Sequence, residues 1–353
     1  MSKPNVLITL DSMKYPNTGL FHYGKSLGNA LIKGNNNNFD FTYYIYKKTA
    51  GYFEGRVKLL ERITLHKLWF AKRNKFKITH FTDQFCRLKP QQVGGKKILT
   101  IHDLNQLYDE SWPAEKLNKY INRLGGYINS CHHIVAISNF VAGEVLTHFP
   151  QAKDKLTVIY NGADKPEVAP GYNPVYRPNR QFLFTIGMLT PKKNFHVLPA
   201  LLQGNDMELV IAGIESSYKD KIIAEAEKYG CANRIKITGP VSEADKAWYY
   251  KNCEAFVFPS LAEGFGLPVI EAMHFGKPVF LSRYTSLPEV GGSFAWYFDS
   301  FDAGAMQLTL LNGLQEFHEK KLSEGIQQYA GKFNWDQTAK EYLELYKKSL
   351  LIS

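Results

Sequence analysis

The most informative pattern in the chain is Phe258-Pro-Ser-Leu-Ala-Glu-Gly-Phe-Gly-Leu-Pro-Val-Ile-Glu-Ala272. The run from Cys253 to Phe258 is short, apolar and aromatic, which predicts a buried strand. Gly264 and Gly266 follow, and their missing Cβ atoms allow a sharp turn close to a ligand. Pro268 suits the first position of a helix, where its missing N–H is not needed. The stretch therefore predicts a strand, a glycine loop and a helix start.

The loop and the helix start form a candidate anion site. The first N–H groups of a helix and the positive end of its dipole favour a phosphate. Glu263 lies in the loop, and Glu271 is expected in the first helical turn, leaning back toward the same site. Because carboxylates accept hydrogen bonds from a vicinal diol, a nucleotide-diphosphate sugar fits. The alternative is a glycine-rich turn with one capping and one solvated glutamate, and spacing alone does not separate the two.

Length and composition indicate a globular protein of two domains. The chain has 353 residues, 44% hydrophobic and 22% charged, enough for two separate cores. No apolar run approaches membrane-spanning length, and the N-terminus lacks a secretory pattern, so we expect a cytoplasmic protein. The four cysteines form no C-x-x-C pair, which indicates reduced thiols and no metal site.

Basic residues are concentrated in the first half of the chain. Residues 1–164 hold 23 Lys and Arg against 12 Asp and Glu, whereas residues 165–353 hold 20 against 21. This excess indicates an anionic partner for the first half. Within it, residues 57–77 resemble a basic amphipathic helix that could rest on an anionic membrane surface. A solvated helix face over the core is the alternative. The sequence contains no nucleic-acid motif, so no nucleic-acid partner is expected.

Further candidate residues follow other predicted strands. His102 comes directly after the strand Lys97–Ile101, at the carboxyl end where open α/β sheets bind ligands. Lys192 and Lys193 lie at a loop-to-helix junction, well placed to neutralise a diphosphate leaving group. Gly19 lies in the loop after the first strand, where a plain turn glycine is the alternative interpretation.

Several of these segments resemble one family. The pattern Pro-Ser-x-x-Glu-Gly-Phe-Gly-Leu-Pro-x-x-Glu-Ala around Glu263 and Glu271 resembles the signature of retaining glycosyltransferase family four. Further matches are Thr-x-His-Asp at His102, the strand ending in Ser138, and Ser-Leu-Pro-Glu-Val from Ser286. The match at Gly-Met-Leu-Thr-Pro-Lys-Lys-Asn, residues 187–194, resembles the branch rich in mannosyltransferases.

The resemblance implies the GT-B fold, with two Rossmann-like doubly wound domains facing each other across a cleft that holds the donor sugar. It implies an acceptor domain over residues 1–165, completed by a terminal helix over 334–353. A proline-rich linker is expected over 166–180. The nucleotide-sugar domain is expected over 181–333.

The resemblance also assigns roles to residues. It implies catalytic roles for His102, Glu263 and Lys193. Met188 replaces an arginine found in one version of the motif, which makes Lys192 the expected second phosphate contact. The full set implied to bind the donor is Gly19, Ser138, Gly187, Lys192, Lys193, Gly239, Val241, Glu263, Gly264, Phe265, Gly266, Leu267 and Glu271.

The function implied is transfer of a hexose, mannose favoured, with retention at the anomeric carbon. GDP-mannose is the first expected donor and a UDP-hexose the second, with no metal and no cofactor. The expected acceptor is a glycan or lipid-linked glycan of surface polysaccharide or lipopolysaccharide biosynthesis, which would place the protein on the inner face of the cell membrane. The alternatives are a nucleotide-sugar epimerase of the same fold and a non-catalytic protein that binds an anionic polymer.

Overall fold

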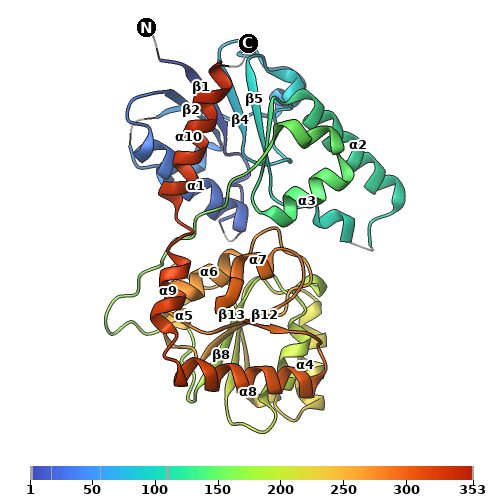
Figure 1. Cartoon of the computed structure of the whole chain (residues 1–353), viewed down its shortest axis with the longest axis vertical. Helices are drawn as coiled ribbons and strands as arrows, with labels where there is room; N and C mark the ends of the chain where they lie inside the picture. The colour runs from blue at the N-terminus through green and yellow to red at the C-terminus, as the bar shows by residue number, and fades with distance from the viewer. Residues whose placement is uncertain (1–2, 17, 56, 109–110, 352–353) are drawn as a thin grey trace. The chain divides into compact units, whose positions relative to one another are not determined.

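A computed structural model describes residues 3–16, 18–55, 57–108 and 111–351. The chain divides into two compact units (Figure 1). Unit 1 comprises Met1–Gly162 and Phe333–Ser353, and unit 2 comprises Ala163–Lys332. Residues 352–353, the expected end of the terminal helix, lie outside the described residues.

Unit 1 is built on a parallel sheet, seven-stranded in its described part, with the order β3-β2-β1-β4-β5-β6-β7. The strands are β1 (Asn5–Thr9), β2 (Asp40–Ile45), β3 (Lys58–Glu61), β4 (Ile78–Phe81), β5 (Lys96–Ile101), β6 (His133–Ala136) and β7 (Leu156–Val158). The α-helices are α1 (Gly19–Gly34), α2 (Ala114–Ser130), α3 (Asn139–His148) and α10 (Trp335–Leu351).

Unit 2 repeats this plan with a parallel sheet that is six-stranded in its described part, in the order β10-β9-β8-β11-β12-β13. The strands are β8 (Phe182–Ile186), β9 (Glu208–Ala212), β10 (Ile235–Gly239), β11 (Ala255–Phe258), β12 (Val279–Ser282) and β13 (Ala295–Phe298). The α-helices are α4 (Tyr218–Lys228), α5 (Glu243–Asn252), α6 (Leu267–His274), α7 (Leu287–Gly291), α8 (Ala303–Glu319) and α9 (Ser323–Ala330).

Both sheets have the doubly wound strand order, which confirms the predicted fold class for each unit. In each, the first strand lies inside the sheet, two strands follow on one side and the remainder on the other. The central strands are buried along their whole length, as expected for parallel strands covered on both faces. The order reverses between β1 and β4 in unit 1 and between β8 and β11 in unit 2, and open α/β sheets bind ligands at such points.

Side-chain caps explain where several helices begin. The Thr18 hydroxyl accepts a hydrogen bond from the Phe21 N–H at the start of α1. In the predicted capping box before α5, the Asp245 N–H donates to the Ser242 Oγ (3.0 Å) and the Ser242 N–H donates to the Asp245 carboxylate (3.2 Å). The predicted strand ending at Ser138 is too long: β6 ends at Ala136, and Ser138 caps α3 instead.

The expectation of an amphipathic helix over residues 57–77 is wrong. The segment contains the edge strand β3, which pairs in parallel with β2 from Lys58 to Glu61, and a 3-10 turn at Thr64–Lys67. Without β3, the main-chain groups along one side of β2 would have no partner strand. Hydrophobic spacing within residues 57–77 does not show that this segment supplies that partner. The apolar side chains of this segment point largely to solvent, with Leu68 80% and Trp69 62% exposed.

The terminal helix α10 belongs to the core of unit 1. It lies beside α1 in Figure 1, where it is drawn in red and α1 in blue. Its residues Trp335, Ala339, Tyr342 and Tyr346 are buried among the strands and α1. None of the helices in the described part of the chain combines the length and hydropathy that a membrane-spanning helix needs.

Three glycines line the carboxyl ends of neighbouring strands in unit 2. Gly187 follows β8, Gly213 follows β9 and Gly239 ends β10. The Gly187 N–H donates to Ala212 O, and the Gly213 N–H donates to Gly239 O, both at 2.9 Å. Gly213 has a φ of +136°, and a Cβ there would clash with the carbonyl oxygen of Gly187. The close approach of the three chain segments therefore requires glycine at 213.

We expect Gly213→Ala to destabilise unit 2 by at least about 3 kcal/mol, because strain at positive φ adds to a clash with main chain. Gly230→Ala is the matched control: Gly230 also has positive φ (+65°), but a Cβ there meets nothing within 4 Å. Its cost should be about 1 kcal/mol. Urea unfolding of both variants measures the difference, and equal losses would contradict this account.

Candidate functional site

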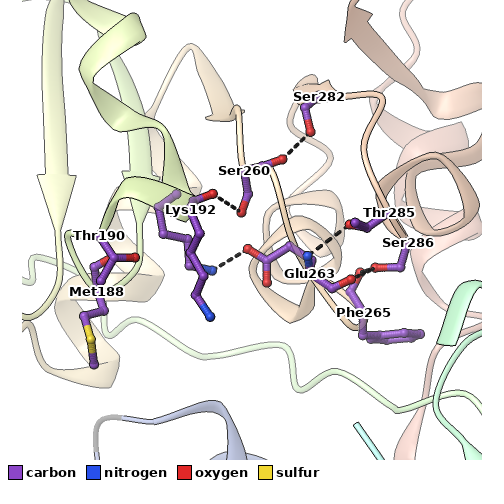
Figure 2. Close-up of polar contacts among 10 residues, drawn as sticks. Met188, Thr190, Lys192, Ser260, Glu263, Phe265, Ser282, Thr285 and Ser286 are labelled. Carbon is purple, nitrogen blue, oxygen red and sulfur yellow. Dashed lines mark hydrogen bonds and ion pairs between the residues drawn. The ribbon is translucent and has the colours of Figure 1, made fainter. Parts of the chain in front are cut away.

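The candidate site of unit 2 lies at the carboxyl ends of β8 and β11, where the strand order reverses. The loop after β8 carries Lys192 and Lys193, and the loop after β11 carries Glu263. Hydrogen bonds tie the two loops together. Lys192 O accepts from the Leu261 N–H at 2.7 Å and from the Ser260 hydroxyl at 3.2 Å, and Figure 2 shows the second of these bonds. The sheet topology thus brings two segments about 70 residues apart in sequence to one place.

Lys193 and Glu263 form an ion pair at this edge, with their side chains only 14% and 15% exposed. The Lys193 ammonium also lies 4.8 Å from the ring centre of Phe258, the last residue of β11. A partly buried ammonium held by a carboxylate and an aromatic face has a defined position. Lys192 is exposed, so of the two lysines it is the one whose charge faces solvent.

The segment after β12 holds the Glu263 loop in place (Figure 2). The Glu263 N–H donates to the Thr285 Oγ1 at 3.0 Å. The Ser286 hydroxyl lies within hydrogen-bond distance of both Glu263 O (3.0 Å) and Phe265 O (2.9 Å). Thr285 has a φ of +56°, an uncommon conformation for a β-branched residue. No sequence pattern singles out Thr285, whereas Ser286 opens the Ser-Leu-Pro-Glu-Val motif.

Helix α6 begins beside this loop. Gly266, with a φ of +113°, is its N-cap, and no side chain in the described structure caps it. Leu267 opens the helix, so Pro268 takes its second position and not the first position predicted for it. An uncapped helix start leaves N–H groups for an anion. Gly264 and Phe265 lie in the preceding loop, with Phe265 buried.

Glu271 lies in the second turn of α6, not in the first as expected, because the helix starts at Leu267. Its carboxylate accepts from the Lys246 ammonium at 3.0 Å and from the Tyr250 hydroxyl at 2.9 Å. Burial alone would lower the pKa of Lys246, but Glu271 and Glu243 outweigh it and raise that pKa to about 12. Lys246 was not predicted as a site residue, since its partner lies on another helix.

The remaining donor-binding candidates divide between the units. Gly187, Gly239 and Val241 lie on the same carboxyl edge of the unit 2 sheet or directly after it. Gly19 and Ser138 belong to unit 1, where Gly19 opens α1 and Ser138 caps α3. Unit 2 therefore collects all the predicted donor-binding residues except these two.

His102 lies in unit 1, directly after β5, and is buried. Its Nε2 lies 2.7 Å from Thr82 O, a partner that can only accept, so Nε2 carries the proton and Nδ1 is left as an acceptor. Burial lowers the pKa of His102, although Thr82 and Asp83 act in the opposite direction. The ring also meets the edge of Tyr23, with centroids 4.5 Å apart. A neutral, oriented imidazole of this kind can accept a hydrogen bond from a hydroxyl.

Asp11 is a further polar residue of unit 1 that the sequence did not single out. It lies after β1 and is 9% exposed, and its Oδ2 accepts from the Arg87 N–H at 2.8 Å. Burial raises the pKa of Asp11 to about 7, with the nearby Asp83 adding to the effect and Arg62 opposing it. Asp11 follows β1 and Arg87 follows β4, and the two residues are neighbours because these strands are adjacent in the sheet.

No group of three or more His, Cys, Asp or Glu side chains suited to a metal ion occurs within the described ranges.

Two doubly wound parallel sheets with helices define the fold class as GT-B, which the solved structures similar to this chain share. Residues 174–324 match the profile of "Glycosyl transferases group 1", and residues 42–165 match that of "Glycosyltransferase Family 4". The chain belongs to glycosyltransferase family 4.

Relatives of known name include mannosyltransferases. The O-antigen chain mannosyltransferase B of Escherichia coli is 27% identical over 268 residues, which cover 71% of this chain and 70% of that protein. A serotype-specific mannosyltransferase WbdA of Escherichia coli is 29% identical over 292 residues, which cover 77% of this chain but 36% of that longer protein.

Solved structures establish the same fold. A glycosyltransferase from Rickettsia africae has a TM-score of 0.76 at 17% identity, with 100% of both chains covered. HepE of Anabaena, solved in complex with UDP and glucose, has a TM-score of 0.70 at 15% identity, with 98% of this chain and 100% of that chain covered.

The raised pKa of Asp11 predicts a pH dependence of stability. The folded chain keeps this proton to about pH 7, whereas the unfolded chain loses it near pH 4, so the folded state binds more protons in between. The free energy of unfolding therefore falls as pH rises through this window. In Asp11→Asn, the loss between pH 5 and pH 7.5 should be smaller by about 2 kcal/mol.

Urea unfolding at the two pH values measures this change. Asp154→Asn, which alters an exposed acid of the same unit, is the control and should behave as the wild type. If Asp11→Asn keeps the full pH dependence of the wild type, the proton resides elsewhere.

Proposed function

We propose that this glycosyltransferase is a retaining hexosyltransferase that moves mannose from GDP-mannose to a glycan or lipid-linked glycan acceptor. A UDP-hexose is the second candidate donor. The observation that carries the proposal is the single edge of unit 2 that gathers Lys192, Lys193, Glu263 and the start of α6. The names of its O-antigen mannosyltransferase relatives favour mannose and a role in surface polysaccharide or lipopolysaccharide biosynthesis.

The departing diphosphate would be stabilised by this chain's own positive groups. The ammonium groups of Lys192 and Lys193 and the first N–H groups of α6 offer charge and hydrogen bonds where the leaving group develops its negative charge. With these groups as the stabilising charges, we propose that transfer is metal-independent. The acceptor hydroxyl attacks from the leaving-group face, and its proton passes to a phosphate oxygen, which accounts for retention without a protein nucleophile.

The two glutamates and His102 position the donor. Glu263 accepts hydrogen bonds from hydroxyls of the transferred sugar, and Glu271, held by Lys246 and Tyr250, accepts those of the ribose. His102 accepts from a sugar hydroxyl through Nδ1 and helps to position the transferred carbon.

The epimerase alternative differs in its reactants. An epimerase would consume the nucleotide sugar without any acceptor, whereas a transferase needs one. Product analysis by NMR separates the two, because transfer with retention gives a new glycosidic bond with the anomeric configuration of the donor. An unchanged rate after chelation of divalent cations would support metal independence.

A screen of nucleotide sugars by thermal shift tests the donor. GDP-mannose at about a hundred times its Kd should stabilise the protein by about 2.7 kcal/mol. Glu271→Ala should abolish this shift, because the ribose contact and the partner of Lys246 are both lost. His102→Ala should keep the shift but lose transfer. Near-normal turnover in His102→Ala would remove that residue from the catalytic assignment.

The acceptor side points to an anionic membrane surface. The exposed apolar residues of the 58–69 segment are Leu59, Ile63, Leu65, Leu68 and Trp69. The exposed Lys58 and Lys67 interleave with them, a combination that favours the interface of a membrane with anionic lipids. A lipid-linked acceptor would be met there, with the protein cytoplasmic and peripheral on the inner face of the membrane.

Vesicle binding tests this surface. The double variant Leu68→Ser, Trp69→Ser should bind vesicles of phosphatidylglycerol and phosphatidylcholine at least about tenfold more weakly, since each apolar side chain contributes more than 1 kcal/mol when buried. Leu311→Ser, at a 66% exposed leucine of unit 2, is the matched control and should bind normally. Equal binding of all three proteins, or equal binding to pure phosphatidylcholine, would contradict the assignment.

A further inference from the structure

Three side chains at the carboxyl edge of the unit 1 sheet carry buried polar atoms without partners. These atoms are Oδ1 of Asp11 and the Nε groups of Arg62 and Arg87, which have no hydrogen-bond partner among the described residues. Asp11 is 9% exposed, and both arginines are partly buried. Buried polar groups are normally hydrogen-bonded, so three orphaned atoms in one place indicate a partner that binds from outside.

The sheet places these residues side by side. Arg62 follows β3, Asp11 follows β1 and Arg87 lies in the segment after β4. The strand order β3-β2-β1-β4 makes them a row across the point where the order of the sheet reverses. His102 follows β5, the next strand in that row. The three residues thus lie on the same edge as the proposed catalytic histidine.

Main-chain bonds and an aromatic ring fix the positions of the two arginines. The Arg62 N–H donates to Ile45 O at 2.7 Å, and its guanidinium lies 4.9 Å from the ring centre of Tyr46. The Arg87 N–H donates to Asp11. Both positive charges act on the buried hydroxyl of Tyr44, where burial raises the pKa and the arginines oppose that rise.

Among the described residues, neither guanidinium pairs with a carboxylate. No described carboxylate lies within ion-pair distance of Arg62 or Arg87, although Asp11 and Asp83 are close enough to affect the electrostatics of the cluster. Partly buried guanidiniums are normally paired with an anion, often through two parallel hydrogen bonds. The anion that would complete these two arginines is therefore not supplied by the part of unit 1 that the structure describes.

We propose that Asp11, Arg62 and Arg87 form the acceptor subsite for a sugar that carries a phosphate or a carboxylate group. The proposal rests on the proposed transferase function and specifies the class of its acceptor. Asp11 Oδ1 accepts a hydrogen bond from a sugar hydroxyl, and the two guanidiniums bind the anionic group.

The combination of a carboxyl oxygen and two guanidiniums selects a sugar acid or sugar phosphate over simpler ligands. A bare phosphate ion satisfies the guanidiniums but brings no sugar hydroxyl to Oδ1 of Asp11. A neutral sugar satisfies Asp11 but leaves both guanidiniums without an anion. A sugar bearing an anionic substituent meets both requirements at once, and the basic excess of residues 1–164 attracts it over a longer range.

Direct binding to the full-length protein tests the subsite. The probes are glucose 1-phosphate, which has the anomeric phosphate of a lipid-linked sugar, glucose 6-phosphate and glucuronate, with glucose and inorganic phosphate as controls. Titration by NMR should give saturable binding of at least one anionic sugar, tighter than either control. Comparison of the three anionic sugars shows which source of the anion the site prefers.

Variants identify the binding residues. Arg62→Met and Arg87→Met should each weaken the preferred anionic sugar by about tenfold or more, with glucose changed less than about twofold. Arg73→Met removes an exposed arginine of the same unit and should change neither. GDP and UDP binding, measured on the same samples, verifies folding and reports on the proposed transferase function separately.

These measurements distinguish a failure of the acceptor subsite from a failure of the proposed transferase function. Loss of anionic-sugar binding in both arginine variants, with nucleotide binding retained, supports the subsite. The proposal is overturned if no anionic sugar binds saturably, if glucose or inorganic phosphate binds as tightly, or if the two arginine variants bind like the wild type. A wild-type protein that binds no nucleotide sugar would instead reject the transferase function.

Discussion

The constraint on which both sites depend is the parallel direction of the strands. Parallel strands all end at one edge, so the segments that follow them are gathered there whatever their distance in sequence. In unit 2 this brings the loop after β8 against the loop after β11, where Lys192 O receives two hydrogen bonds from the second loop. Several segments of the chain converge at this edge, and a side chain at position 213 would clash with the Gly187 carbonyl. This crowding explains the glycine at 213. Chemistry and packing are therefore set by one geometric rule.

In unit 1 the terminal helix α10 packs against residues that lie next to the carboxyl edge of the sheet. The Tyr342 hydroxyl lies 3.1 Å from that of Tyr23 and 2.9 Å from that of Thr100, which in turn lies 2.9 Å from His80 Nε2. Burial lowers the pKa of His80 to about 3, so this network is neutral at ordinary pH. Because the ring of Tyr23 also packs on His102, the last helix of the chain helps to orient a residue some 240 positions earlier.

Local patterns were predictable from sequence, and pairings between distant segments were not. The strand, glycine loop and helix start around Glu263 follow from residues next to one another, and so does the capping box at Ser242. The partner of Glu271 on α5 depends on how two helices pack, which no local pattern encodes. The row formed by Asp11 and Arg62 depends on strand order, and the helix expected over 57–77 failed because an edge strand competes for the same residues.

In the proposed function, the ion pairs of unit 2 also determine how the diphosphate of the donor binds. In this structure Lys193 is already neutralised by Glu263, and Lys246 by Glu271, so the attraction for a diphosphate comes first from exposed Lys192 and the start of α6. A phosphate oxygen that shares the Lys193 ammonium draws charge away from Glu263, whose carboxylate is then better able to accept hydrogen bonds from sugar hydroxyls. Without a ligand, Lys193 and Glu263 are each other's partner. A ligand that carries both phosphates and hydroxyls can bind the lysine through a phosphate and the glutamate through a hydroxyl. An isolated phosphate engages the lysine but leaves the carboxylate without a donor, so in the proposed function the pair favours a nucleotide sugar over a simpler anion.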